Sequence, residues 1–75
     1  MNQNFKEWQP VTSPPQLKRA DLFGAECERS EEVTIRDEHG NEGKGYFLRV
    51  AKEIEVFGYN EEGNLIDSLI TNWKL

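Results

Sequence analysis

The sequence has very few of the side chains on which catalysis and metal binding usually depend. It contains one cysteine, Cys27, and one histidine, His39, whereas a structural zinc site takes four such ligands. His39 lies in a stretch with the composition of an exposed turn, so a turn residue is a simpler interpretation than a catalytic base. We therefore assign no catalytic residue, no metal site and no cofactor, and we expect that the protein is not an enzyme.

Long apolar runs are also missing. No stretch approaches the ~20 apolar residues that cross a bilayer, and residues 1–8 lack the apolar run of a signal peptide. A single cysteine cannot form an internal disulfide, which fits a reducing compartment. We therefore expect a cytoplasmic protein without membrane contacts.

The length of 75 residues predicts one small domain with a single thin core. A chain of this size buries only ~60% of its unfolded surface, so a homodimer or a bound partner would add to its stability. The composition divides the domain into an extended arm at 1–13, a short helix and an acidic segment at 14–32, and an antiparallel sheet at 33–75.

The region that contains all three prolines predicts the extended arm and then a short helix. Proline is tolerated in an edge strand or in the first turn of a helix, but not inside a sheet. Ser13 as the N-cap and Gln16 at the third helical position would form a capping box. Apolar residues follow at helical spacing from Leu17 to Phe23, which predicts a helix near 14–23.

Two glycine-closed turns, at 37–41 and 60–64, separate runs of strand-forming residues. Each turn has the acidic or amide residues and the glycine that are typical of a longer hairpin link. The sequence therefore predicts a mainly β fold, a small antiparallel meander of three to four strands that could curl into a half-barrel. The strands are expected at about 33–37, 44–51, 53–59 and 64–68.

The last segment has two competing periodicities. The turn chemistry before residue 64 favours a returning strand at 64–68. Apolar residues from Leu65 to Trp73 also fall on one face of a helix. An α+β fold with a C-terminal helix at 65–73 is therefore the alternative, and residues 69–73 fit either structure.

The negative charge is concentrated in one segment. Residues 26–42 contain seven acids and two bases, whereas the rest of the chain contains seven of each. A local negative field favours a basic partner and disfavours phosphate or anionic lipid. A solvated surface run is the alternative interpretation. The candidate partner-binding acids are Glu26, Glu28, Glu31, Glu32, Asp37 and Glu38.

Large apolar groups occur on both faces of the central strands. Phe47 belongs to one face, and alternation puts Phe57 and Tyr59 on the face opposite Ile54 and Val56. Three arrangements fit this pattern: the arm and helix cover the second face, the sheet curls into a barrel, or the face stays open for a partner. On the third arrangement, Phe47, Phe57 and Tyr59 join the candidate partner-binding residues.

These features predict a small non-enzymatic interaction module, an adaptor, inhibitor or accessory subunit. It would bind a protein with a basic surface through the acidic segment, the aromatic face or a sheet edge, and it would not bind nucleic acid directly. The alternative is an acidic mimic of nucleic acid, for example from a phage or mobile element, that inhibits a nucleic-acid-binding protein. A homodimer is a further candidate arrangement.

Overall fold

The computed structural model describes residues 7–22 and 25–75, and these residues form strands and no helix. None of the described residues belongs to a helix long and apolar enough to cross a membrane. The strands are β1 (Gln9–Pro10), β2 (Lys18–Leu22), β3 (Ala25–Arg29), β4 (Val33–Asp37), β5 (Glu42–Val50), β6 (Glu53–Tyr59) and β7 (Ile70–Lys74).

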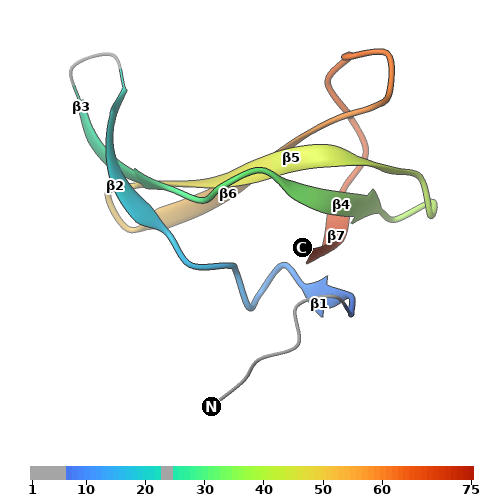
Figure 1. Ribbon diagram of the computed structural model, residues 1–75, viewed down its shortest axis with the longest axis horizontal. Coiled ribbons are helices and arrows are strands. Elements are labelled where there is room, and N and C mark those ends of the chain that lie inside the picture. The colour runs from blue at the N-terminus through green and yellow to red at the C-terminus, as the bar shows by residue number, and fades with distance from the viewer. Residues whose placement is uncertain (1–6, 23–24) are drawn as a thin grey trace.

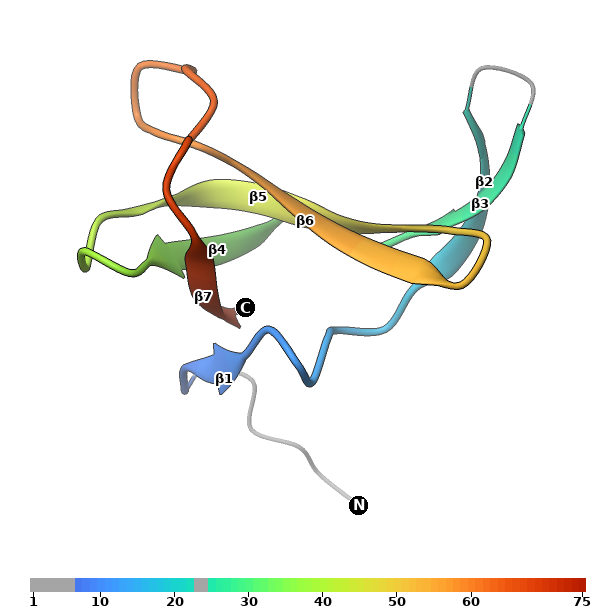
Figure 2. The same cartoon turned by 180° about the vertical axis from the view of Figure 1, so that it is seen from behind.

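All of the described strands belong to one antiparallel sheet, in the order β1-β7-β4-β5-β3-β2, with β6 also paired to β5. β4 and β3 pair with successive parts of β5, and β6 pairs along the length of β5 from Lys44 to Val50. β5 and β6 form a long ribbon, from whose ends the β2–β3 hairpin and the segment between β6 and β7 rise (Figures 1 and 2). The prediction of a mainly β fold with a sheet curled into a half-barrel is confirmed.

The core lies on one face of this sheet, here called the core face. It consists of five buried side chains, Val33, Ile35, Phe47, Ile70 and Trp73. The rings of Phe47 and Trp73 meet edge to face with centroids 6.1 Å apart, an arrangement that adds to the stabilisation from buried area. Val11 of the N-terminal arm and Leu17, which follows the arm, pack partly buried against the same cluster, so this part of the chain covers the core face.

Both predicted glycine-closed turns are present. Gly40 and Gly63 each have a φ of 84°, in the left-handed region that glycine adopts without steric cost. Asp37 and Asn60 begin the two turns, and the side-chain oxygen of each accepts hydrogen bonds from backbone N–H groups two and four residues later. These Asx-type turns explain why the two sequences look alike.

The predicted helix near 14–23 is wrong in its described part. Lys18–Leu22 is strand β2, and it pairs residue by residue with β3. The Ser13 carbonyl accepts a hydrogen bond of 2.8 Å from the Trp73 indole, which ties this segment to the core in an extended form. Pairing with the next strand, β3, has overridden a short local helix signal, because so short a helix is marginal without packing.

The C-terminal predictions also need correction. The expected strand at 64–68 is reduced to an isolated bridge between Tyr59 and Leu65, and the alternative helix at 65–73 does not form. The last strand is instead β7, which pairs with both β4 and β1. The described residues therefore form more strands than the three to four that the sequence predicts.

A candidate protein-interaction face

The register between β5 and β6 determines which side chains share the face opposite the core. Tyr46 is directly opposite Phe57, and Lys44 is opposite Tyr59. Directly opposed residues of antiparallel strands point to the same side of the sheet. Tyr46, Leu48, Val50, Phe57 and Tyr59 therefore share one face, here called the open face, and Glu53 and Glu55 lie beside them.

The open face keeps apolar area in contact with solvent. Val50 is 51% exposed and Tyr59 is 37% exposed, while the other three apolar side chains are half-buried. Among the described residues, the main contacts between strands are those between neighbours in the sheet, so no second layer of strands packs on this face. Of the three arrangements that fit the sequence, the structure combines a curled sheet with one face that is left open.

An aromatic pair lies at the centre of the open face. The rings of Tyr46 and Phe57 stack with centroids 5.5 Å apart and an interplanar angle of 30°. The guanidinium carbon of Arg29 lies 4.3 Å from the centroid of the Tyr46 ring, within the range of a cation–π contact. The pair is thus held in place before any partner binds.

Phe47 has a different environment from Phe57 and Tyr59. It points to the core face and is only 1% exposed, and its backbone N–H donates to the Ser30 hydroxyl at 2.8 Å. Alternation along β5 explains the difference, because successive side chains point to opposite faces. The structure thus brings together two of the three aromatic residues predicted for partner binding.

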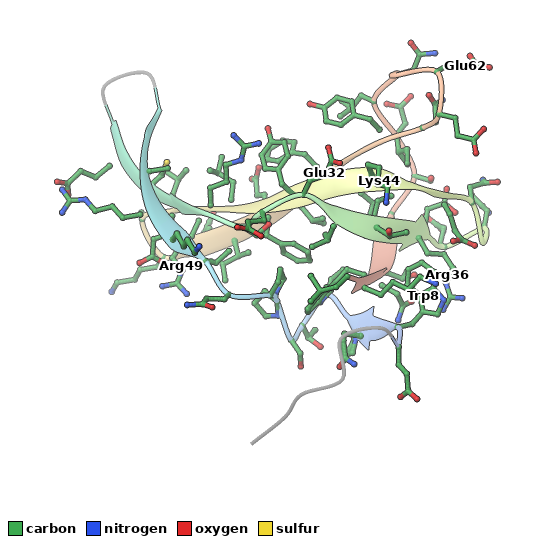
Figure 3. The ribbon with its side chains drawn as sticks, viewed as in Figure 1. Trp8, Glu32, Arg36, Lys44, Arg49 and Glu62 are labelled. Carbon is green, nitrogen blue, oxygen red and sulfur yellow. The ribbon has the colours of Figure 1, made fainter. Side chains whose placement is uncertain are left out.

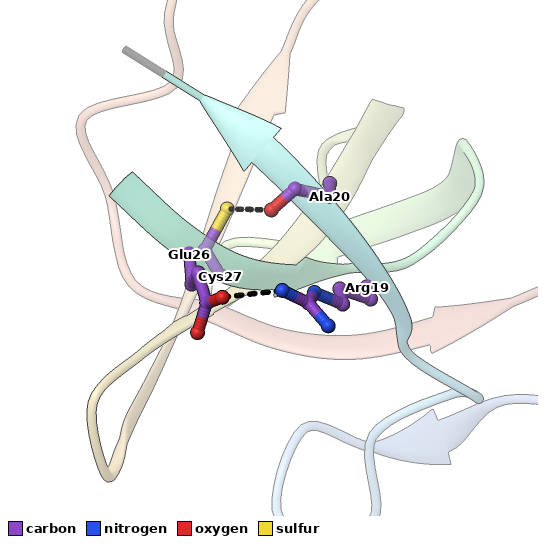
Figure 4. Close-up of polar contacts among 4 residues, drawn as sticks. All are labelled: Arg19, Ala20, Glu26 and Cys27. Atoms are coloured by element: carbon purple, nitrogen blue, oxygen red, sulfur yellow. Dashed lines mark hydrogen bonds and ion pairs between the residues drawn. The ribbon is translucent and has the colours of Figure 1, made fainter. Parts of the chain in front are cut away.

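Three of the predicted acidic residues are paired with cations from other segments. Glu26 pairs with Arg19, Glu28 with Arg49 at 3.1 Å, and Glu31 with Lys18 at 3.7 Å. Figure 4 shows the first of these pairs across the β2–β3 hairpin. Pairing of this kind reduces the local field that the sequence predicts.

Glu32 is exposed and has no ion-pair partner within residues 7–22 and 25–75. Three of the six predicted acids are thus paired with cations, and the acidic segment carries less unpaired charge than the sequence suggests.

Asp37 and Glu38 have structural roles in the fold. The buried carboxylate of Asp37 accepts hydrogen bonds from the Ser68 hydroxyl at 2.5 Å and from the backbone N–H groups of His39 and Asn41. The Ser68 hydrogen bond is the main cause that lowers the pKa of Asp37 to about 2, while burial opposes it. Glu38 accepts a hydrogen bond of 2.9 Å from the Leu69 backbone N–H. Both carboxylates hold the segment before β7 against the first turn.

A second acidic surface lies between the two glycine-closed turns, where it lines a hollow of about 480 Å³. Carboxylates from two separate parts of the sequence meet there, so a search for charge along the chain does not find it. This acidic surface could have been predicted from the sequence through the expected pairing of β5 with β6, because that pairing brings the two turns together. Its exposed carboxylates are those of Glu42, Glu61, Glu62 and Asp67.

A second aromatic group that the sequence interpretation did not identify lies where the arm meets the sheet. The ring centroid of Trp8 is 4.3 Å from the guanidinium carbon of Arg36 and 4.5 Å from the ammonium nitrogen of Lys74. Trp8 and Arg36 lie side by side at this end of the molecule (Figure 3). Two cations on one ring fasten the arm to β4 and β7.

The residues that could support chemistry lie apart from one another. Cys27 is a buried free thiol whose sulfur donates to the Ala20 carbonyl at 3.2 Å (Figure 4). His39 is exposed in the first turn. No group of three or more His, Cys, Asp or Glu residues in the described part of the chain could hold a metal ion.

Comparison of the chain with protein families, with curated proteins and with solved structures gives no match. The function is therefore argued from the surface alone. Its most developed feature is the open face, because there a preformed aromatic pair adjoins exposed apolar side chains and two carboxylates.

Proposed function

We propose that this protein is a non-enzymatic interaction module that binds a partner protein on the open face. The observation that supports this proposal is the stacked pair Tyr46–Phe57, which shares its face with the exposed side chains of Tyr59 and Val50. Aromatic anchors fixed in position lose little conformational entropy when they are buried by a partner. Contiguous exposed apolar surface is also uncommon on small proteins that have no partner.

The carboxylates at one end of the face favour a partner that is basic at its rim. Glu53 and Glu55 lie opposite Val50 and Leu48, and neither has an ion-pair partner in the described part of the chain. Charges at the rim of an interface mainly raise the association rate and exclude partners of like charge. The module would thus combine an apolar centre with a negatively charged end, whereas Lys44 lies at the opposite end of the face.

Affinity capture with matched surface variants tests the proposal. Val50→Asp and Tyr59→Asp each place a charge on the open face, whereas Leu69→Asp alters an exposed leucine away from it. We expect the same captured protein with the wild type and with Leu69→Asp, and its loss with both open-face variants. Circular dichroism verifies that each variant is folded. A captured protein that binds all four chains equally well contradicts the proposal.

An acidic mimic of nucleic acid is the second candidate function, and the hollow between the two turns favours it. The hollow is lined by residues of both turns together with the exposed carboxylates of Glu42, Glu61, Glu62 and Asp67. A complex of this kind would weaken steeply with salt and would be displaced by duplex DNA. A captured complex that is affected neither by salt nor by duplex DNA favours binding at the open face over binding at the hollow.

A cytoplasmic location is part of the proposal. The single cysteine is a buried free thiol, which suits a compartment where thiols stay reduced. Fractionation of cells that produce the protein, followed by immunodetection, tests this location.

A further inference from the structure

Among the described residues, no strand pairs with the outer edge of β6 between Glu53 and Val56. The backbone N–H and C=O of Phe47 bond to Ser30, on the side of β5 away from β6. Val56 is directly opposite Phe47, so its own backbone groups point away from β5, because such pairs alternate along an antiparallel ladder. The Gly58 carbonyl also points away from β5 and accepts from Ile66 N–H at 2.8 Å.

The same alternation applies to Ile54. The N–H and C=O groups of Ile54 and Val56 therefore point to the outer edge, and no other strand of the described chain pairs with β6 there. Ile54 is 38% exposed. An edge of this kind can accept one more strand through main-chain hydrogen bonds.

A hollow of about 290 Å³ lies beside this edge, on the open face. Its lining consists of two apolar side chains from β5, Leu48 and Val50, and two carboxylates from β6, Glu53 and Glu55. A lysine or arginine fits such a lining, since its aliphatic stem lies on apolar surface while its charged head reaches a carboxylate. The hollow therefore indicates which side chains a strand at this edge would carry.

We propose that β6 binds an extended segment of a partner protein in which basic and apolar residues alternate. The segment adds a strand to the sheet. Its lysines or arginines lie on the open face beside Glu53 and Glu55, and its apolar residues extend the core face beside Ile54 and Val56. This inference rests on the proposed function, for which it specifies the chemistry of the partner.

A second copy of the chain is disfavoured at this edge in the two registers that are centred on Ile54 and Glu55. Two β6 strands paired antiparallel about an axis at Glu55 would place this residue opposite Glu55 of the second copy. Shifting the axis to Ile54 would place Glu53 opposite Glu55 instead. Like charges directly opposite each other destabilise a strand pair, and charged residues on an edge are a common barrier to self-association. In these registers the edge thus disfavours its own copy and favours a basic strand.

A short peptide provides the test. The probe is the capped heptapeptide acetyl-Thr-Lys-Val-Lys-Val-Lys-Thr-amide, and the control replaces each lysine with glutamate. Titrations followed by backbone amide shifts should show saturable binding of the lysine peptide only. With the peptide bound, amide exchange at Ile54 and Val56 should slow, while Glu53 and Glu55 amides, which already face β5, should change little. Equal binding of both peptides, or protection that is absent at Ile54 and Val56, overturns the inference.

Two variants separate the edge from the face. Ile54→Pro removes an N–H that points away from β5, which an edge strand tolerates, and should weaken peptide binding by about tenfold or more. Tyr59→Asp alters the open face next to the isolated bridge with Leu65, away from the hollow, and should leave peptide affinity within about threefold. If Ile54→Pro does not fold, the inference is tested by amide exchange at Ile54 and Val56 of the wild-type protein, measured with and without the peptide.

The two proposals can fail separately. If the lysine peptide does not bind while Tyr59→Asp still abolishes capture of the partner, the inference about the edge is wrong and the proposed function stands. If capture is insensitive to every open-face variant and the peptide does not bind, both are wrong.

Discussion

The hydroxyl of Ser68 donates a hydrogen bond of 2.5 Å to the carboxylate of Asp37, a residue 31 positions earlier in the chain. This contact joins the segment before β7 to the turn between β4 and β5. Leu69 N–H, which bonds to the Glu38 side chain, reinforces it. A turn residue that looks purely local in the sequence therefore also fixes where the last strand begins.

The pH dependence of stability should reveal this contact. The Ser68 hydrogen bond and the backbone donors lower the pKa of Asp37 to about 2, against about 3.9 in an unfolded chain. The contribution of the ionised carboxylate is complete above the unfolded pKa. It declines as the pH falls below about 4, because the unfolded state then binds the proton first, and it is lost below about 2.

Urea unfolding of the wild type and of Asp37→Asn measures the effect. The difference in unfolding free energy between the two proteins should be constant from neutral pH to about pH 5 and should shrink between about pH 4 and 2. In a Ser68→Ala background, the effect of Asp37→Asn on the unfolding free energy should begin to shrink at about the same pH. It should disappear at a higher pH, because without the Ser68 hydrogen bond the pKa of Asp37 is lowered less. A difference that does not vary with pH contradicts the assignment.

Ser30 provides a second prediction, because its hydroxyl is built into the sheet. The Ser30 side chain accepts from the buried Phe47 N–H at 2.8 Å and donates to the Glu31 carbonyl at 2.8 Å. Ser30→Ala leaves the Phe47 N–H without its partner, which should cost about 1–3 kcal/mol. Ser13→Ala, at an exposed position where only the main chain is used, should change stability by less than about 0.5 kcal/mol. Equal effects of the two substitutions in chemical denaturation would contradict this role.

Two glycines allow a matched comparison of close packing with backbone conformation. A Cβ on Gly45 would lie 2.1 Å from the Phe57 carbonyl oxygen, whereas a Cβ on Gly40 would have open space around it. Gly40→Ala should therefore cost only the left-handed backbone strain of about 1–2 kcal/mol. Gly45→Ala should lower the unfolding free energy more, because the strands β5 and β6 must move apart to make room for the Cβ. Of the two variants, Gly45→Ala should therefore have the lower midpoint of thermal unfolding. The reverse order would contradict the close approach of these strands.

The parts of the fold that depend on short-range chemistry could be predicted from the sequence. The two turns with Gly40 and Gly63, and strand β6 with its bounds, follow from glycine placement and alternation. The β4–β5 hairpin follows for the same reason. Strand β7 could not be predicted, because its partners β4 and β1 lie far away in the sequence. Strand β2 was missed although its partner β3 follows it directly. Local helical spacing at Leu17 gave a misleading signal.

The ion pairs, like the pairing of β7, depend on residues from other segments of the chain. The run of acids from Glu26 to Glu31 looks unpaired in the sequence, yet its cations come from Lys18, Arg19 and Arg49. The sequence could predict that Phe57 and Tyr59 lie on the same face, since they are two residues apart on one strand. The stacking of Phe57 on Tyr46 depends on the register between β5 and β6. The hydrogen bonds between the two strands fix this register, and the amino-acid composition does not reveal it.

Cys27 offers a way to measure local opening at the other end of the molecule. Its thiol is buried and bonded to the Ala20 carbonyl of β2, and the main contacts of β2 are with β3 alone. A strand held by a single neighbour should open below the free energy of global unfolding. Under native conditions a thiol reagent should therefore label Cys27 at a rate that depends less steeply on urea than global unfolding does, while Trp73 fluorescence stays native. If labelling and global unfolding share the same free energy and urea dependence, the β2–β3 hairpin opens only with the whole sheet.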